Sequence, residues 1–168
     1  MINSLIKNNE FKRPFSFYVF SQKIISINKD KLFLLGLFIK IFLIIFLSPP
    51  LISDLFLPFI RGLIENLNYD PWTFHLLNQG DVNAFPYGIT MILISLPFSV
   101  IGYTIDNNIH DFNFFEIGFK LTSLFFDYFL LLCLYFLTKE KARSLLITIY
   151  WLSPITIYCT YIYGAIDI

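Results

Sequence analysis

The sequence predicts an all-α integral membrane protein, built as a polytopic helical bundle. Of its 168 residues, 57% are hydrophobic and 20% are aromatic, whereas only 14% are charged. The mean hydropathy is +0.68. A soluble domain of this size is nearer half apolar and a quarter charged, so the composition indicates a chain that lies in lipid. The formal net charge of zero argues against a nucleic-acid partner.

The first 31 residues predict a basic cytoplasmic lead-in to the membrane domain. They carry six basic residues against two acidic ones. The segment is too long for a secretory signal peptide and lacks the small-residue cleavage site of one. Because positive charge is retained on the cytoplasmic side, we expect the N-terminus to be cytoplasmic.

The first membrane span is predicted at 32–52, which at 1.5 Å per residue covers roughly 30 Å. Lys40 interrupts its apolar run. We expect that lysine to pack toward neighbouring helices or to extend along the helix toward the interface. Pro49 and Pro50 should end the helix, because proline has no N–H and disfavours helix in the residue before it.

An acidic segment follows and is predicted to face the external compartment. Between residues 53 and 115, Arg61 is the single strong base against six acidic residues. By the charge rule this segment lies outside, with an external loop at 53–87. Within it we expect an amphipathic helix at 55–67, broken near Pro58, and then a polar loop at 68–86.

The apolar stretch at 88–105 leaves two topologies open. It has the length of a span, but Pro97 lies in its middle and no positive residue follows it directly. If it spans, the basic cluster at 139–143 falls outside the cell, against the charge rule. If it re-enters or lies at the interface, the cluster falls inside. We favour the second interpretation, three spans plus an interfacial helix, over four spans.

Two further spans are predicted at 116–137 and 145–163, the last kinked by Pro154. Lys120 and Asp127 are seven residues apart and share one helix face, so this face must meet protein or water. Three or four helices are too few to give every intramembrane charge a partner. We therefore expect residues 32–168 to be an incomplete membrane domain, the N-terminal part of a longer protein.

Several short motifs occur in a recognisable order along residues 32–168. They are Ser53-Asp54, Asp70-Pro71-Trp72, Phe85-Pro86-Tyr87-Gly88, Gly118-Phe119-Lys120 with Asp127, Trp151-Leu152-Ser153-Pro154, and Tyr163-Gly164-Ala165-Ile166-Asp167. This order resembles the start of the GT-C superfamily of membrane glycosyltransferases, which take sugars from polyprenyl-phosphate-linked donors. Each motif alone has low specificity, and the order carries the resemblance.

The resemblance implies a hexosyltransferase, with a hexose such as mannose moved to a glycan, lipid or protein acceptor. It places the enzyme in a bacterial inner or plasma membrane, or in the endoplasmic reticulum of a eukaryote. Asp54 matches the position of the catalytic carboxylate. The residues that we expect to bind substrate are Asp70, Trp72, Tyr87, Lys120 and Asp167.

Two departures from the family pattern affect these expectations. Many relatives carry two acidic residues where this chain has Asp54 followed by Leu55 and Phe56, so the use of a divalent metal stays open. Where relatives often have Gly-Gln-x-Asp, this chain has Gly164-Ala165-Ile166-Asp167, so any amide contact is missing.

Structural interpretations stand beside these assignments. Asp54 can cap the helix that follows it, and Asp70-Pro71-Trp72 can be a turn with an interface anchor. Asp167 can be an ordinary boundary residue, and Lys120 and Asp127 can serve as partners of other helices. Two other classes of function also remain: a transporter or channel with Lys40, Lys120 and Asp127 along its path, and a non-catalytic membrane scaffold.

Overall fold

The computed structural model describes residues 24–66, 70–78, 80–109 and 113–165. All regular structure within these ranges is helical, which confirms the predicted all-α class. In the described residues, three helices are long and apolar enough to cross a membrane, and a bent pair at the start raises the number to as many as four.

Helix α2 (Lys31–Phe46) is the first long helix, and it is shorter than the predicted span. The carboxylate of Asp30 caps its start by accepting a hydrogen bond from the N–H of Leu32 at 2.8 Å. The chain turns extended at Leu47, before the two prolines, and then bends by 55° into the next helical segment. The predicted boundary at Ile52 is therefore wrong, because the proline pair acts on the residues before it.

The next segment joins η1 (Leu51–Phe56) and α3 (Leu57–Glu65) into one continuous helical run. The N–H of Leu57 bonds to the carbonyl of Ile52, five residues earlier, so the run begins as a π-helix. This wider turn brings the chain to Pro58, which has no N–H to donate, without a break. The predicted break near Pro58 is wrong. Asp54 consequently lies inside a helix and not in a loop.

A short helix, α4 (Pro71–Leu77), lies in the segment that the sequence predicts as polar loop. Asp70 is its N-cap, and Pro71 takes the first helical position, where a missing N–H has no consequence. The loop prediction is wrong here because seven residues are too few to show a helical period of hydrophobicity.

Helices α5 (Ile89–Asp106) and α6 (Phe114–Leu137) form the most extensive helix pair. Pro97 lies inside α5 without interrupting it. The two carboxylate oxygens of Asp106 accept from the first two N–H groups of α6, at 2.6 and 2.9 Å. These bonds satisfy donors that a helix start leaves unpaired, and they hold the end of α5 to the beginning of α6.

Two glycines let the backbones of α5 and α6 approach closely. A β-carbon added at Gly102 would lie 2.3 Å from the carbonyl oxygen of Phe114. One added at Gly118 would lie 2.4 Å from the carbonyl oxygen of Phe98. Small residues of this kind are the usual means by which membrane helices pack tightly.

The last helical stretch, here called the C-terminal helix, begins after the turn η2 (Glu140–Ala142). It consists of α7 (Arg143–Leu146), η3 (Ile147–Trp151), α8 (Pro154–Ile157) and η4 (Tyr158–Tyr163). It is distorted just before Pro154, as the sequence predicts, and Ser153 caps the renewed helix by accepting from the N–H of Thr156. Gly164, at φ 87°, ends it in the left-handed conformation that favours glycine.

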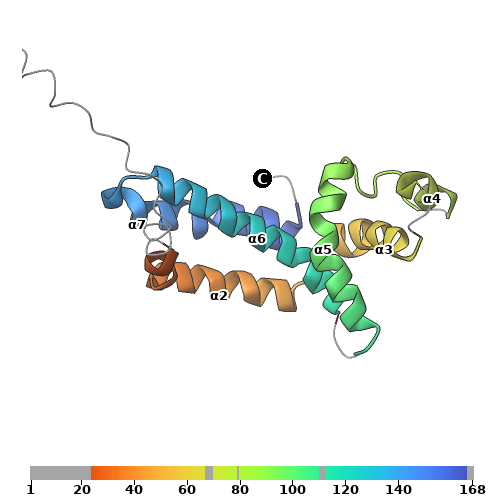
Figure 1. Cartoon of the computed structure of the whole chain (residues 1–168), viewed down its shortest axis with the longest axis horizontal. Helices are drawn as coiled ribbons and strands as arrows, with labels where there is room; N and C mark the ends of the chain where they lie inside the picture. Colours follow the sequence, from red (N-terminus) through yellow and green to blue (C-terminus); the bar gives the residue numbers. More distant parts are fainter. Residues whose placement is uncertain (1–23, 67–69, 79, 110–112, 166–168) are drawn as a thin grey trace, which may run out of the picture.

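The long helices α2 and α6 and the C-terminal helix extend along the long axis of the molecule (Figure 1). Helix α6 is antiparallel to α2, because Phe33 near the start of α2 packs on Tyr128, whereas Ser48 just beyond its end contacts Glu116.

The C-terminal helix runs in the same direction as α2. Phe33 stacks on Trp151 with 5.1 Å between ring centroids. At the other end, a β-carbon added at Gly164 would lie 2.9 Å from Ile52 Cγ1 and 3.0 Å from Pro49 Cβ. The described residues between 47 and 113, which include α3, α4 and α5, therefore form an end region, and α5 runs across the long axis there (Figure 1).

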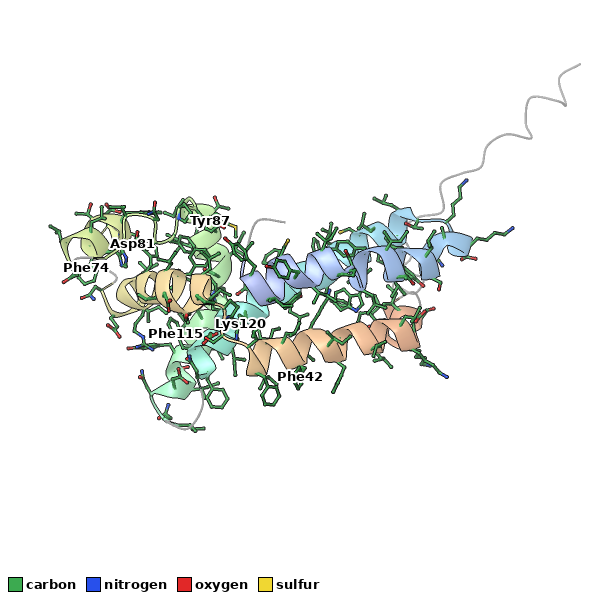
Figure 2. The ribbon with its side chains drawn as sticks, turned by 180° about the vertical axis from the view of Figure 1, so that it is seen from behind. Phe42, Phe74, Asp81, Tyr87, Phe115 and Lys120 are labelled. Atoms are coloured by element: carbon green, nitrogen blue, oxygen red, sulfur yellow. The ribbon has the colours of Figure 1, made fainter. Side chains whose placement is uncertain are left out.

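Large apolar side chains cover the outer face of α2. Phe38 is 68% exposed, and Phe42 points away from the rest of the molecule (Figure 2). Leu34, Leu35 and Phe46 are exposed in the same way. A continuous face of this kind is typical of a helix in contact with lipid, and it is consistent with a membrane location.

Candidate functional site

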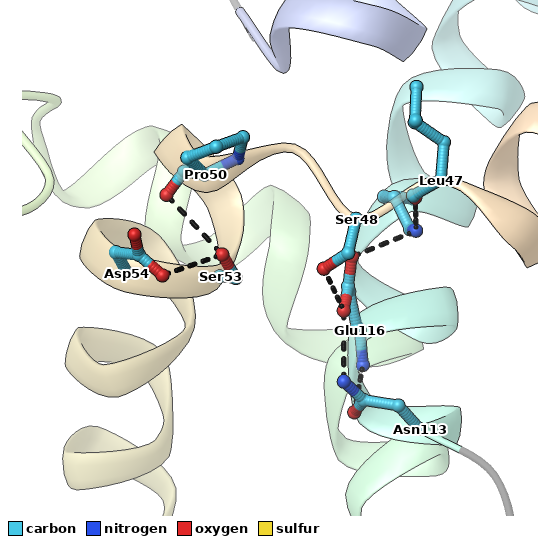
Figure 3. A network of polar contacts seen from close by, with 8 residues as sticks. Leu47, Ser48, Pro50, Ser53, Asp54, Asn113 and Glu116 are labelled. Atoms are coloured by element: carbon cyan, nitrogen blue, oxygen red, sulfur yellow. Dashed lines mark hydrogen bonds and ion pairs between the residues drawn. The ribbon is translucent and has the colours of Figure 1, made fainter.

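A cluster of polar groups lies where α2 ends and α6 begins (Figure 3). At its centre is Glu116, whose Oε2 accepts from the Ser48 hydroxyl at 2.8 Å and from the Asn113 side-chain amide at 2.9 Å. Its Oε1 lies 2.9 Å from the Nζ of Lys120. The carboxylate is almost fully buried, so these partners offset the cost of removing its charge from water.

Lys120, predicted to bind substrate, takes part in this cluster. Besides its ion pair, its ammonium group donates to the carbonyl oxygen of Leu47 at 2.6 Å. That carbonyl belongs to the end of α2, where backbone acceptors lack helical partners. Lys120 is 5% exposed. In this geometry it ties the end of α2 to α6.

Asp54 differs from these residues in being exposed. The hydroxyl of Ser53 donates to its Oδ1 at 2.7 Å and lies 3.5 Å from the carbonyl oxygen of Pro50 (Figure 3). Pro50, and not Asp54, is the N-cap of η1. Asp54 lies in the first turn, where a carboxylate interacts favourably with the helix dipole. It thus presents an accessible carboxylate at the start of the end region.

Asp70 has a defined structural role in capping α4. Its Oδ2 accepts from the Thr73 hydroxyl at 2.6 Å and from the Thr73 N–H at 3.3 Å. These bonds favour the ionised form, so the Thr73 hydroxyl first of all, and then the backbone, lower the pKa of Asp70. The geometry matches the interpretation of Asp70-Pro71-Trp72 as a helix start.

Trp72 and Tyr87 join an aromatic cluster packed against the helix that carries Asp54. The ring centroid of Trp72 lies 5.6 Å from that of Phe59, and Tyr87 meets Phe56 edge-on at 5.7 Å. Both predicted substrate-binding aromatics are half-buried. Each ring therefore packs partly on protein and leaves part of its surface accessible.

Phe85 fixes the loop between α4 and α5. Its backbone has φ 62°, a left-handed conformation that costs a side chain roughly 1–2 kcal/mol. Its ring is fully buried and stacks on Phe59 with 5.0 Å between centroids. Burying a ring of this size contributes about 1.5–3 kcal/mol, which is enough to hold the strained backbone.

Asp167 lies outside the described residues. The structure does place the end of the segment leading to it, since Gly164 packs beside Pro49 and Ile52 at the start of η1. Asp54 and Gly164, three residues before Asp167, thus lie at one end of the bundle.

A second polar cluster, here called the bundle hub, lies between α2, α6 and the C-terminal helix. The Nζ of Lys40 is 2.5 Å from Asp127 Oδ2, which also accepts from the Tyr161 hydroxyl at 2.9 Å. Asp127 Oδ1 accepts from the Tyr150 hydroxyl at 2.6 Å. The Lys40 ammonium lies 3.5 Å from the centroid of the Trp151 ring, a cation–π distance.

The bundle hub corrects one expectation from the sequence. Lys40 and Asp127 do find partners within this chain, and the prediction that its helices would leave them unpaired is wrong. The sequence shows each charge separately but does not show the register that joins them. The two tyrosines could have been noticed as hydroxyl donors on a helix that must meet the Lys120–Asp127 face.

The described residues contain no group of three or more His, Cys, Asp or Glu side chains placed to hold a metal ion. Cys133 and Cys159 are both free. No protein-family model matches the sequence, and neither a curated protein nor a solved structure matches it. The resemblance to the GT-C superfamily therefore rests on the order of its motifs.

Proposed function

We propose that this chain belongs to a membrane glycosyltransferase that moves a hexose, such as mannose, from a polyprenyl-phosphate donor to an external glycan, lipid or protein acceptor. Asp54 is the proposed catalytic base. The observation that carries the proposal is the convergence at the end of the bundle. Asp54 is exposed on η1, and Gly164, where the C-terminal helix ends, packs against Pro49 and Ile52 at the start of the same segment.

The arrangement of the helices supports an external site. Because α6 is antiparallel to α2 and the C-terminal helix is parallel to it, the described residues between 47 and 113 lie at one end of the bundle. Helix α5 ends there too, since Asp106 at its end accepts hydrogen bonds from the first N–H groups of α6. The antiparallel order of α2 and α6 supports an interfacial α5. By length and composition alone, α5 is one of the three helices in the described residues that could cross a membrane, and α2 qualifies together with the segment after its bend. With the basic N-terminal segment inside, Asp54 faces the external compartment.

The chemistry is an inverting displacement at the anomeric carbon. The Asp54 carboxylate takes the proton from the acceptor hydroxyl while that oxygen forms a bond to the sugar carbon. The bond between the sugar carbon and the phosphate oxygen breaks, and its electron pair leaves with the polyprenyl phosphate. A phosphate is already a good leaving group, so the protein needs a positioned base more than a strong acid.

The other proposed substrate-binding residues act around this carboxylate. The accessible parts of Trp72 and Tyr87 offer faces on which a sugar can stack. Lys120 acts indirectly, by holding Leu47 and hence the turn that leads into η1. Asp167 positions the acceptor or a cation. Asp70 caps α4, the helix that carries Trp72.

The transporter alternative expects Lys40, Lys120 and Asp127 to line one path. The structure joins Lys40 to Asp127 but places Lys120 in the separate Glu116 cluster. Both lysines are paired and buried. This separation favours the enzyme over a continuous charged path.

The proposal is tested by Asp54→Asn in membranes containing the protein, with a radiolabelled polyprenyl-phosphate hexose as donor. We expect transfer to fall by roughly a hundredfold or more while donor binding and Tm are kept. Asp167→Asn should cost less, and Asp81→Asn is a matched control because Asp81 is also an exposed acid of the end region. Transfer within a few-fold of normal in Asp54→Asn would contradict the proposal.

A further inference from the structure

A cavity of about 240 Å³ lies between α5, α6 and the C-terminal helix, next to the bundle hub. Its wall is mostly apolar, from side chains such as Met91, Ile94 and Phe126. Polar groups from two helices interrupt this wall: Thr122, Ser123 and Asp127 of α6, and Thr156 and Thr160 of the C-terminal helix.

Two of these hydroxyls are buried without a hydrogen-bond partner. Thr122 and Thr160 are 4% and 7% exposed, and their hydroxyl groups make no hydrogen bond to any atom in the described part of the chain. Other threonine hydroxyls bond to a backbone carbonyl of their own helix. Thr138 and Thr148 donate to the carbonyl four residues earlier, at 2.7 and 3.1 Å.

A buried hydroxyl without a partner costs about 1–3 kcal/mol. A threonine in a helix commonly donates to the carbonyl four residues earlier. Neither Thr122 nor Thr160 makes this bond, and both residues line the same cavity. We therefore expect an occupant of the cavity that forms hydrogen bonds with both.

The charge of the surroundings limits what this occupant can be. Asp127 is neutralised by Lys40, so the site as a whole carries no net charge. A cation here would leave an excess positive charge in a low-dielectric region, which is strongly unfavourable. A hydrocarbon chain cannot bond to the hydroxyls. The occupant is therefore neutral and both donates and accepts hydrogen bonds.

We propose that this cavity is an intramembrane hydration site, in which water molecules bridge Thr122, Thr160 and Asp127. Asp127 Oδ1 accepts one hydrogen bond, from Tyr150, and has a second lone pair for a water donor. A buried water needs two to four polar partners, and each takes about 30 Å³ of liquid volume. The cavity therefore holds several waters, which hydrate one side of the buried ion pair.

The first test replaces the hydroxyls by methyl groups of the same shape. If water occupies the cavity, Thr122→Val and Thr160→Val each remove a water ligand and should lower Tm by about 2–5 °C in lipid nanodiscs. If the cavity is dry, the same change removes an unsatisfied polar group, and Tm should rise or stay the same. Thr148→Val is the control, because its hydroxyl is bonded within its own helix.

The second test identifies the occupant through thiol chemistry. In a background of Cys133→Ala and Cys159→Ala, Thr122→Cys and Thr160→Cys are treated in membrane vesicles with methyl methanethiosulfonate, a small uncharged reagent that the neutral cavity does not repel. The reagent attacks thiolates, which form only in contact with water. Both should react at least about tenfold faster than Phe129→Cys and Ile155→Cys, although those two positions are far more exposed in the structure, at 56% and 75%.

The outcomes separate the alternatives. A lowered Tm in the valine variants together with fast thiol modification supports the hydration site. A raised or unchanged Tm overturns it. A lowered Tm without modification also overturns it, and points instead to a polar side chain of another membrane helix as the occupant.

Discussion

Two aspartates in this molecule occupy opposite environments. Asp127 lies in the middle of α6, is 9% exposed, and is bonded by Lys40 and two tyrosine hydroxyls. Asp54 lies on η1 at the end of the bundle, is exposed, and accepts a bond from the adjacent Ser53. In an apolar chain, a carboxylate surrounded by partners from other helices stabilises the fold, whereas an exposed one without such partners is available for chemistry.

The largest expected effect comes from breaking the bundle hub on one side. Asp127→Leu leaves the Lys40 ammonium buried and unpaired, and should cost about 3–5 kcal/mol of unfolding free energy. The double variant Lys40→Met with Asp127→Leu removes both charges and should recover most of that loss. Equilibrium unfolding in lipid nanodiscs measures all three proteins and completes a double-mutant cycle.

An unchanged stability in Asp127→Leu would show that Lys40 has another way to satisfy its charge. If the double variant is as unstable as the single one, packing around Trp151, and not charge, determines how much the bundle hub contributes to the unfolding free energy.

A smaller effect is expected in the end region, where the close approach of α5 to α6 can be disturbed without touching either aspartate. In Gly118→Ala the new β-carbon meets backbone at Phe98, which cannot move aside easily, so we expect a loss of about 1–3 kcal/mol. Gly88→Ala is the matched control, because nothing lies within 4 Å of a β-carbon at that position.

The same unfolding experiment measures both glycine variants. If the two regions are as separate as the structure indicates, Gly118→Ala should leave the coupling between Lys40 and Asp127 unchanged. A changed coupling energy would mean that α5 supports the hub directly.

The smallest effect is expected for the cap at Asp70. Because its pKa is lowered on folding, its contribution is fully present above the unfolded value, near pH 4, and is lost as the pH falls through the folded pKa. Asp70→Ala should therefore speed amide exchange at Thr73 severalfold at neutral pH, with a Tm change of at most about 2 °C. The difference from the unmodified protein should shrink at low pH. A difference that does not depend on pH would assign the cap to packing.

The long helices could be predicted from the sequence, because apolar length alone identifies a span such as 116–137. The need of α6 for partners also followed from two charges on one face. The identity of the partner of Asp127 could not be predicted. Lys40 and Asp127 are 87 residues apart in the sequence, and their pairing depends on how α2 and α6 are aligned along their axes.

The sequence predicted Asp54 just beyond the first long helix, but it did not predict the geometry around that residue. Pro49 and Pro50 were expected to end a helix, but the 55° bend of the chain into η1 was not expected. That bend places Asp54 within a helix. The roles of Phe85 and Asp106 are set by a left-handed backbone and by contacts across a chain reversal. Neither feature has a recognisable sequence pattern.

The pairing of Lys40 with Asp127 also determines how the bundle responds to an electric field. A membrane potential of 100 mV acts on one elementary charge with up to about 2.3 kcal/mol across the full bilayer. The field exerts opposite and equal forces on two opposite charges in contact at one depth. The membrane potential therefore does not change the stability of the bundle hub. Neutralising Asp127 alone would leave the Lys40 charge in the field, and the stability of the bundle would then depend on whether the membrane is energised.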